Sequence, residues 1–555
     1  MHEGVKTSAR GIAHTLGERA DRVFIRKIDA ESRGATAGGD ERFRPCAGFA
    51  LLTVDEKDTR AKVGKGERDR FTHLSFTPHS SKHDTASGEV HSAPLGPFAE
   101  RHRKTGLGPL GMKYVMSKGQ MRKLLRVKRI GVVAGTLLVT ALSLIGVQSI
   151  TRGTPVRAVV AIGKQAGPPA ITDSLFSRMT ELYTGLDLTP GNAAEEVDNG
   201  EVYKRLWVDL RAAKRTITVQ MYYSQPGAVA DTMAVILKQK AREGLRVLLV
   251  LDAFGSMNLK KEWADSIRAA GVEIGLLRQI HWYTLHNFGD RSHVRVVVMD
   301  GEIGYTGGFG LADYWLGDGR HPDQWRDSNV RFEGPSVMGL QAAFASAWAE
   351  CTGELIAGDT FFPKRAFTAV DGGMKAGIFF ASPTTGSTPA ERFIALSVAS
   401  ARRTLYVSNS YFVPDDDFRK LLVEAHKRGV DVRILTVSKM TDVKTTWWAG
   451  RSRYEELLKA GVRIYEYQPA MMHSKTFIVD GMWGAIGSMN FDNRSLAFNN
   501  ESNFVFLDAP FGAKMDSVFA DDLTRSKEIT LTEFSKRPWY NRLIENAAGL
   551  MSRLL

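Results

Sequence analysis

Cysteine is nearly absent from this chain of 555 residues, which contains only Cys46 and Cys351. The two cysteines lie far apart and in unlike contexts. The sequence therefore indicates neither a disulfide framework nor a thiolate metal site. No cluster of carboxylates with metal-ligand spacing stands out either. At this length the chain can bury two cores of ordinary size, so it does not need such cross-links.

Excess positive charge is missing from most of the chain, although the formal net charge is +13. Residues 1–111 carry a net +4, and residues 112–129 hold seven basic residues and no acidic one. Residues 130–555 are left with about +2. A surface that binds duplex nucleic acid needs clustered cations to displace counterions. The composition therefore does not favour a nucleic-acid partner.

Recognisable strands and amphipathic helices are missing from residues 1–111, which are rich in Gly, Ser, Thr, Arg and Asp. We expect this region to be disordered. A second interpretation is that the start of the chain is assigned too far upstream and that translation begins at Met112 or Met116. A His-rich metal-binding arm is the functional alternative, but the seven histidines of this region show no tight ligand spacing.

Charge is also absent from residues 130–150, which are mostly apolar. About 20 such residues suffice to span a bilayer, so the segment predicts one transmembrane helix. The basic juxtamembrane segment 112–129 precedes it, and we expect residues 151–194 to be a linker. By the positive-inside rule, the single-pass chain would have a cytoplasmic N-terminus and an extracytoplasmic catalytic part. A buried core helix and an uncleaved signal anchor are the alternatives.

The rest of the sequence repeats one order of predicted elements. Each copy has a strand, a helix, a strand, a further helix ending near a glycine, a strand, and then a strand that carries a histidine. The predicted strands are 217–223, 246–251 and 272–277 before His293, and 405–413, 430–437 and 462–467 before His473. The duplication predicts an α/β fold of two similar β-α-β repeat halves, residues 195–375 and 376–555. We expect mainly parallel or mixed central sheets flanked by helices.

The two copies also share a set of chemically active residues. Each has a histidine, then a cation two positions later, an aspartate seven later and a small residue fourteen later. The sets are His293, Arg295, Asp300, Gly307 and Gly308, and His473, Lys475, Asp480, Gly487 and Ser488. A set that occurs twice predicts one active site assembled between the two halves.

These residue types suit phosphoryl transfer. Each His–cation pair offers an imidazole and a fixed charge to one anion, and the small residues would let backbone N–H groups approach a phosphate. One neutral imidazole can attack phosphorus while the other donates a proton to the leaving alkoxide, with no metal or cofactor. Asp327 and Glu501 are candidates to orient the imidazoles. A structural histidine is the more common case for one motif alone, and solvated surface acids are the alternative for Asp327 and Glu501.

At these residues the chain resembles the phospholipase D superfamily, the HKD family, and looks most like bacterial cardiolipin synthases. The resemblance covers about residues 195–555. The segment HSKTFIVDGMWGAIGSMNFDNRS (473–495) matches the family pattern H-x-K-x4-D-x6-G-S-x-N in full. The first half contributes TGGFGLADYWLG (306–317) and QWRDSNVRFEGPSV (324–337).

The resemblance implies a metal-independent transfer through a phosphohistidine. It makes His293 the nucleophile and His473 the general acid and base. The other implied roles are phosphate binding by Arg295 and Lys475 with help from Ser488 and Asn490, orientation of the imidazoles by Asp327 and Glu501, and fixing of the motif loops by Asp300 and Asp480.

Two positions depart from the family pattern. Arg295 stands where the family has lysine, and Gly310 stands where it has asparagine. Arginine keeps the charge but is a planar fork, and glycine removes an amide that could bind phosphate. These changes could lower activity or exchange the roles of the two histidines.

The leading functional hypothesis is a membrane-anchored phosphatidyltransferase that makes cardiolipin from two molecules of phosphatidylglycerol and releases glycerol. The alternatives are a phospholipase D that forms phosphatidic acid, a phosphodiesterase or nuclease, and a catalytically impaired lipid-binding relative. At the C-terminus, Trp539, Leu543, Leu550 and Leu554 follow helical spacing. They predict either a docked terminal helix or one lying on a membrane interface. The oligomeric state does not follow from the sequence.

Overall fold

The computed structural model describes residues 118–151, 154–160, 167–279, 290–364, 369–383 and 387–552. The predicted extension 1–111 and the first part of the juxtamembrane segment lie outside these residues. The basic residues from 118 on and the whole of segment 130–150 fall within one helix, α2 (Lys118–Thr151). Within the described ranges, no helix combines the length and the apolarity that a membrane crossing requires.

The first repeat begins earlier than expected, with β1, and ends with α7. Its elements are β1 (Thr189–Asp198), α4 (Glu201–Ala212), β2 (Thr216–Met221), α5 (Ala228–Arg242), β3 (Arg246–Asp252), α6 (Lys261–Arg268), β4 (Glu273–Leu277), β5 (Val296–Met299), β6 (Ile303–Gly307), the 3-10 turn η2 (Asp313–Trp315), β7 (Trp325–Arg326), β8 (Ser328–Glu333) and α7 (Ser336–Thr352). They follow the order that the sequence predicts.

The second repeat has the same order and adds elements at its end. It consists of β9 (Met374–Ala381), α8 (Pro389–Ser400), β10 (Thr404–Asn409), α9 (Asp416–Lys427), β11 (Asp431–Val437), α10 (Lys444–Lys459), β12 (Arg463–Tyr467), β13 (Met471–Met472), β14 (Lys475–Val479), β15 (Trp483–Gly487), α11 (Asn493–Ala497), β16 (Glu501–Leu507), α12 (Ala509–Leu523), β17 (Ser526–Ile529), α13 (Leu531–Ser535) and α14 (Trp539–Leu550).

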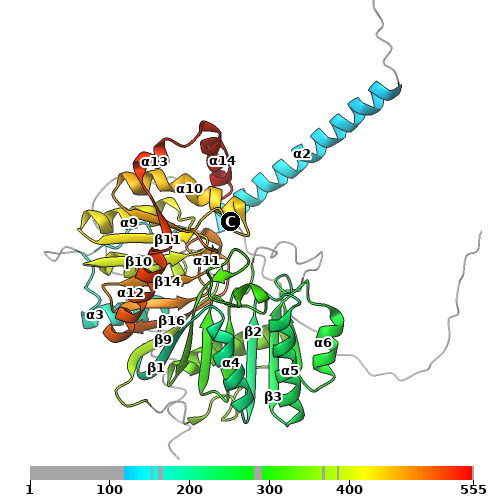
Figure 1. The fold of residues 1–555 in the computed structure, drawn as a ribbon, viewed down its shortest axis with the longest axis vertical. Helices are drawn as coiled ribbons and strands as arrows, with labels where there is room; N and C mark the ends of the chain where they lie inside the picture. Colours follow the sequence, from blue (N-terminus) through cyan, green and yellow to red (C-terminus); the bar gives the residue numbers. More distant parts are fainter. Residues whose placement is uncertain are drawn as a thin grey trace, which may run out of the picture. The chain divides into compact units, whose positions relative to one another are not determined.

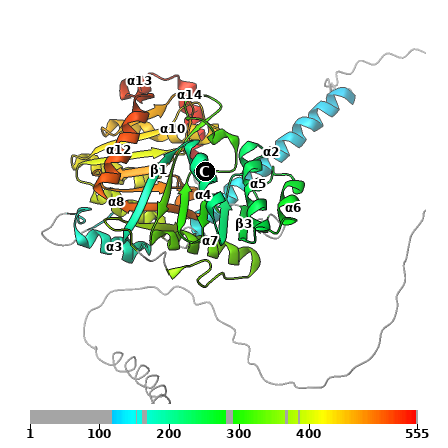
Figure 2. The same cartoon turned by 60° about the horizontal axis from the view of Figure 1, so that its bottom comes forward.

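The strands of both repeats, apart from β7 and β13, which pair with each other, form one continuous sheet, and it is mixed, as the second of the two predicted arrangements expected. Its order is β17-β12-β11-β10-β14-β15-β16-β9-β1-β8-β6-β5-β2-β3-β4. Apart from β17, the order reads alike from both ends, and β1 and β9 meet in the middle, where Figure 2 shows β1 between the strands of the two halves. Only β2-β3-β4 and β10-β11-β12 pair in parallel within this sheet.

The antiparallel pairs follow from a local sequence signal. The strand after each motif histidine turns back through Asp300-Gly301 or Asp480-Gly481, and all four of these residues have positive φ. Asp-Gly with positive φ at both positions is the usual two-residue hairpin turn. A hairpin can connect only antiparallel strands, so β5 pairs with β6 and β14 with β15.

Helices cover the outer faces of the sheet, and one hydrophobic cluster combines residues of both halves. Figure 1 shows α4, α5 and α6 against the first-half strands, and α9 and α10 against those of the second half. In this cluster Phe332 and Phe504 meet, with ring centroids 4.8 Å apart. Side chains of both motif strands, among them Val296 and Ile478, also belong to this shared core.

Part of the expected linker 151–194 belongs to the folded body. Helix α3 (Ser174–Thr184) begins at the N-cap Asp173, whose side chain accepts from the Leu175 N–H at 2.9 Å. Phe176 of α3 is fully buried, and its ring contacts that of Trp483 at 5.0 Å. A segment that precedes the first repeat therefore packs into the core of the second.

Candidate active site

The two motif histidines lie immediately before β5 and β14 and are nearly inaccessible. His293 is 8% exposed and His473 is 4% exposed. The strands that follow are apolar and buried along their length. Such strands are held from both faces and fix the position of the residues that precede them.

Each histidine contacts a carboxylate from the opposite half of the chain. His293 Nδ1 lies 3.1 Å from Glu501 Oε2, and His473 Nδ1 lies 2.7 Å from Asp327 Oδ2. Glu501 and Asp327 are both fully buried. A carboxylate on Nδ1 selects the tautomer that carries the proton there, which leaves Nε2 free to react. The two acids that the sequence analysis named thus contact the imidazoles in a crossed arrangement.

The backbone repeats this crossing. The His293 N–H donates to the Asn500 carbonyl at 3.0 Å, and the His473 N–H donates to the Arg326 carbonyl at 2.6 Å. Asn500 and Arg326 are the residues before the two acids. Each histidine is thus fixed to the opposite half by its main chain and by its side chain, as a pseudo-twofold relation between the repeats requires.

The two motif cations are buried beside the histidines. Lys475 Nζ donates to the His473 carbonyl at 2.5 Å and to Ser410 Oγ at 2.8 Å. Arg295 also donates to the carbonyl of its own motif histidine, and its Nε donates to the Phe309 carbonyl at 3.3 Å. Each cation is therefore bound to the backbone of its own motif histidine, where it can stabilise a phosphate anion.

Aromatic rings surround the imidazoles, and the motif search did not identify most of them. Trp325 and Trp315 contact His473, with ring centroids 4.8 and 5.3 Å away. Trp315 Nε1 also donates to Asp327 Oδ2 at 2.7 Å. Tyr222 contacts His293 at 5.0 Å and lies 5.8 Å from the Arg295 guanidinium. The alignment of the repeats could have identified Tyr222, since it occupies the strand position of Ser410.

The small residues after each motif serve the orienting acids. A Cβ on Gly308 would come within 2.3 Å of Asp327 Oδ1, and the Gly308 N–H donates to Asn329 Oδ1 at 3.1 Å. A Cβ on Gly307 would lie 2.3 Å from the same Asn329 oxygen. The glycines thus make room for these side chains, and the Gly308 N–H, predicted to approach a phosphate, donates to Asn329 in this structure.

Ser488 takes the place of Gly308 in the second half. Its hydroxyl donates to Glu501 Oε2 at 2.5 Å and accepts from the Ser502 N–H at 2.9 Å. Asn490 is 3% exposed, and its Oδ1 has no hydrogen-bond partner among the described residues. A buried amide group without a protein partner is suited to contact a ligand. Ser488 therefore positions the acid, while Asn490 can reach a substrate.

The motif aspartates directly follow β5 and β14, at the opposite end of each strand from the motif histidine. Asp300 accepts from the backbone N–H groups of Lys214, Arg215 and Thr216 at 2.7–2.9 Å. Asp480 binds the equivalent loop before β10, including the Thr404 N–H at 2.9 Å. Both aspartates, which the sequence analysis placed among the catalytic residues, thus bind the backbone of a neighbouring loop.

Burial keeps both imidazoles neutral. It lowers the pKa of His293 to about 4, with a further contribution from the Arg295 charge in the same direction. Burial and then the Lys475 ammonium hold the pKa of His473 well below its usual range. The pKa of Lys475 falls to about 7 and that of Asp327 rises to about 6, in both cases mainly through burial. A bound anion would favour the protonated histidine and lysine.

The departure at Gly310 has a structural cause. A Cβ there would lie 2.6 Å from the Tyr223 carbonyl oxygen and 3.0 Å from the Trp315 ring. The backbone and the indole thus occupy the space that an asparagine side chain would need. The first half therefore has no asparagine amide at position 310. In its place Trp315 fills the space and donates a hydrogen bond to Asp327.

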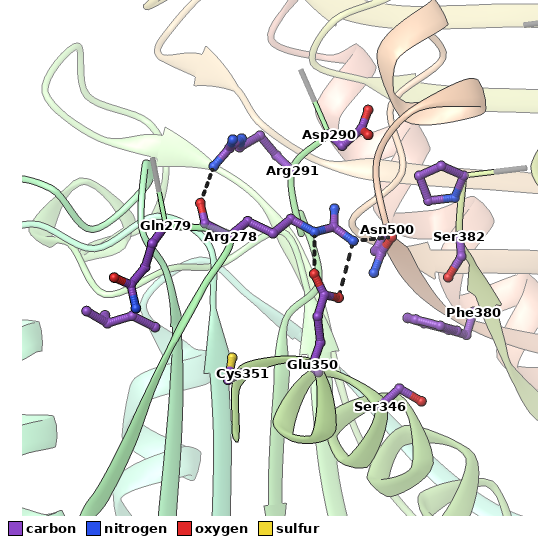
Figure 3. Close-up of a pocket in the computed structure, with 13 residues that line it drawn as sticks. Arg278, Gln279, Asp290, Arg291, Ser346, Glu350, Cys351, Phe380, Ser382 and Asn500 are labelled. Carbon is purple, nitrogen blue, oxygen red and sulfur yellow. Dashed lines mark hydrogen bonds and ion pairs between the residues drawn. The ribbon is translucent and has the colours of Figure 1, made fainter. Parts of the chain in front are cut away.

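A cavity of about 760 Å³ borders the His293 side of the site. It is lined from β4, α7 and β9, and Figure 3 shows Arg278 at its centre, bound to Glu350 and Asn500. Arg278 Nε donates to Glu350 at 2.9 Å and its Nη2 to Asn500 Oδ1 at 3.2 Å. Neither motif histidine is among its described lining residues. Asn500 lines the cavity, and its carbonyl accepts from the His293 N–H.

Comparisons with known proteins agree with this geometry. The family model described as "Cardiolipin synthase, PLD-like domain" matches residues 396–523. A cardiolipin synthase of Alkalihalophilus pseudofirmus is 33% identical over 360 residues, which cover 64% of this chain and 71% of the relative. Cardiolipin synthase A of Pseudomonas putida is 28% identical over 410 residues, covering 71% and 84%.

A solved structure supports the fold. The crystal structure of a phosphatidylserine synthase from Haemophilus influenzae superposes with a TM-score of 0.54 at 12% identity, and covers 68% of this chain and all of the other. The fold and the paired site define an enzyme of the phospholipase D superfamily. With the sequence relatives, they show that the chain belongs to the cardiolipin synthase family of that superfamily.

Proposed function

We propose that the protein transfers a phosphatidyl group from one phosphatidylglycerol to a second one, which forms cardiolipin and releases glycerol. The crossed pair of His–carboxylate dyads, each with a buried cation beside it, is the observation that carries this proposal. The cardiolipin synthase relatives supply the substrate class, and the site supplies groups for both steps of a transfer.

In the first step the neutral His293 acts as nucleophile. Its Nδ1–H donates to Glu501, so the lone pair of Nε2 can attack phosphorus, and the low pKa keeps this lone pair free near neutral pH. The bond between phosphorus and the oxygen of the headgroup glycerol breaks. His473, protonated once the phosphodiester anion is bound, gives its proton to that oxygen. Arg295 and Lys475 stabilise the charge on the phosphoryl oxygens.

In the second step the roles reverse. Neutral His473 accepts the proton of a primary hydroxyl on the second phosphatidylglycerol while that oxygen attacks phosphorus. The phosphorus–nitrogen bond to His293 then breaks and cardiolipin forms. Water would give phosphatidic acid through the same steps. The low exposure of both histidines and the ring contacts of Trp315 and Trp325 around His473 favour exclusion of water.

Membrane attachment through residues 130–150, with the catalytic part outside the cytoplasm, completes the proposal; it is argued from the sequence, whereas no helix among the described residues has the length and apolarity for a crossing. The uncharged segment and the seven cations before it support this topology. A C-terminal reporter enzyme that is active only outside the cytoplasm should be active on the full chain. An inactive reporter on an expressed fusion would contradict the topology without touching the proposed chemistry.

The function is tested with the purified full chain, phosphatidylglycerol and detergent. We expect cardiolipin and glycerol in equal amounts, and no product from His473→Ala. Phosphatidic acid as the main product would replace the transferase by the hydrolase. Cleavage of DNA without lipid turnover would contradict both.

A further inference from the structure

Helix α14 packs on α10 through its polar and small residues. Its buried residues are Glu545, Ala548 and Gly549. A Cβ on Gly549 would lie 2.7 Å from Ser452 Oγ, so the glycine permits close approach of the two helices. The helix is therefore docked, as one of the two sequence-based interpretations expected, but its large apolar residues remain exposed.

The contact between α14 and α10 buries the only acidic residue of segment 536–552. Glu545 is the single acidic residue between positions 536 and 552, and it is fully buried. Its carboxylate accepts from Arg537 Nε at 2.7 Å and from Arg451 Nε at 3.2 Å. The exposed residues of the segment include the cations Lys536 and Arg542 and no acid.

The outer face of α14 is apolar and aromatic. Trp539 is 72% exposed, Leu543 58% and Leu550 80%, and Tyr540, Ile544 and Met551 are exposed as well. A helix facing water normally presents polar residues on that side. Tryptophan, tyrosine and arginine beside leucine are the side chains of helices that lie in a lipid–water interface.

The buried face of α14 packs next to the motif loop of the second half. Ala548 of α14 packs with Val413 and Ala449. The Val413 N–H donates to the Phe491 carbonyl at 3.1 Å, and Phe491 follows Asn490 in the motif loop. Helix α14 is therefore connected through Val413 to the loop that carries Asn490, and its outer face is turned away from this contact.

We propose that the outer face of α14, formed by Trp539, Tyr540, Leu543, Ile544, Leu550 and Met551, is a docking surface for an anionic phospholipid bilayer. The proposal rests on the proposed function, since the two lipid substrates reside in such a bilayer. Apolar side chains enter the interface, and Lys536 and Arg542 meet its negative headgroups. The helix thus brings the catalytic part to its substrates.

Depth-dependent quenching tests the docking directly. The full chain, with Cys46→Ser and Cys351→Ser, carries an environment-sensitive fluorophore at Leu543→Cys and is reconstituted in vesicles of phosphatidylglycerol and phosphatidylcholine. Spin-labelled phosphatidylcholine should quench this probe by about twofold or more. The matched control is Val235→Cys on α5, since Val235 is equally exposed at 58%, and it should not be quenched.

Two results would overturn the docking. One is equal quenching, or none, at both positions. The other is an emission shift that grows with protein concentration and needs no lipid, which would make α14 a contact between copies of the chain.

A kinetic test separates docking from chemistry. Trp539→Ser with Leu543→Ser should lower the ratio of turnover in vesicles to turnover in detergent by about fivefold or more. Val208→Ser with Val235→Ser replaces two exposed valines elsewhere and should leave the ratio unchanged. An unchanged ratio in the α14 variant contradicts the docking. If the parent chain turns over phosphatidylglycerol in neither medium, the proposed function fails, while the quenching result still decides the docking.

Discussion

Each histidine of the site is held by an acid from the other half of the chain, so neither half holds a complete dyad. His293 depends on Glu501 and His473 on Asp327. The repeat in the sequence is compatible with pairing inside each half as well. The crossed pairing engages Nδ1 of each ring, which leaves both Nε2 atoms for the two-histidine transfer that we propose.

Double-mutant cycles distinguish the two pairings. The free energies of unfolding of His293→Ala and Glu501→Gln should be coupled by about 1 kcal/mol, because the residues share a buried hydrogen bond. His293→Ala and Asp327→Asn should add within about 0.5 kcal/mol. Urea unfolding of the single and double variants measures both cycles. Coupling confined to the pair His293 and Asp327 would contradict the crossed arrangement.

Lys475 should set the alkaline limit of substrate binding. Burial lowers the pKa of Lys475 to about 7 in the empty site, so its charge is lost as the pH rises through that value. The kcat/KM reports the free enzyme and should fall over the same range. Arginine stays charged there, so Lys475→Arg should shift the fall to higher pH at whatever absolute rate it retains. An unchanged midpoint would assign the limit to another group.

Restoring the family asparagine at position 310 should not help. The added side chain would meet the Tyr223 carbonyl and the Trp315 ring, so Gly310→Asn should lose about 2 kcal/mol or more of unfolding free energy and gain no rate. Gly353→Asn is the control, since Gly353 ends α7 at φ +78° and a Cβ there meets no atom within 4 Å. Urea unfolding and turnover measure the outcome. A stable and faster Gly310→Asn would show that glycine is a handicap.

At the scale of elements, the motif aspartates organise hairpins. Asp480 combines a positive φ with a carboxylate that accepts backbone N–H groups of the loop before β10. Asp480→Ala should therefore cost about 3 kcal/mol of unfolding free energy, because it leaves these donors unpaired and strains the turn. Asp480→Asn should cost less, since asparagine tolerates positive φ. The KM of the folded fraction should stay unchanged. A raised KM without loss of stability would return Asp480 to the substrate site.

At the scale of the whole molecule, the sequence predicted the repeat, the order of its elements and the two histidines with their acids. It did not predict one continuous sheet, because periodicity identifies strands but not their neighbours. The role of Trp315 could not be predicted either. Its contacts with Asp327 and with the space beside Gly310 depend on the tertiary folding of the first half, and its contact with His473 arises only when the two halves meet.

Trapping the intermediate tests the central claim most directly. The full chain is mixed with phosphatidylglycerol radiolabelled in its phosphate, quenched in alkali because phosphohistidine is labile to acid, and digested for mapping. The account predicts label on His293 in the parent, and neither label nor turnover in His293→Ala. Turnover by His293→Ala, or label found on His473 alone, would contradict it.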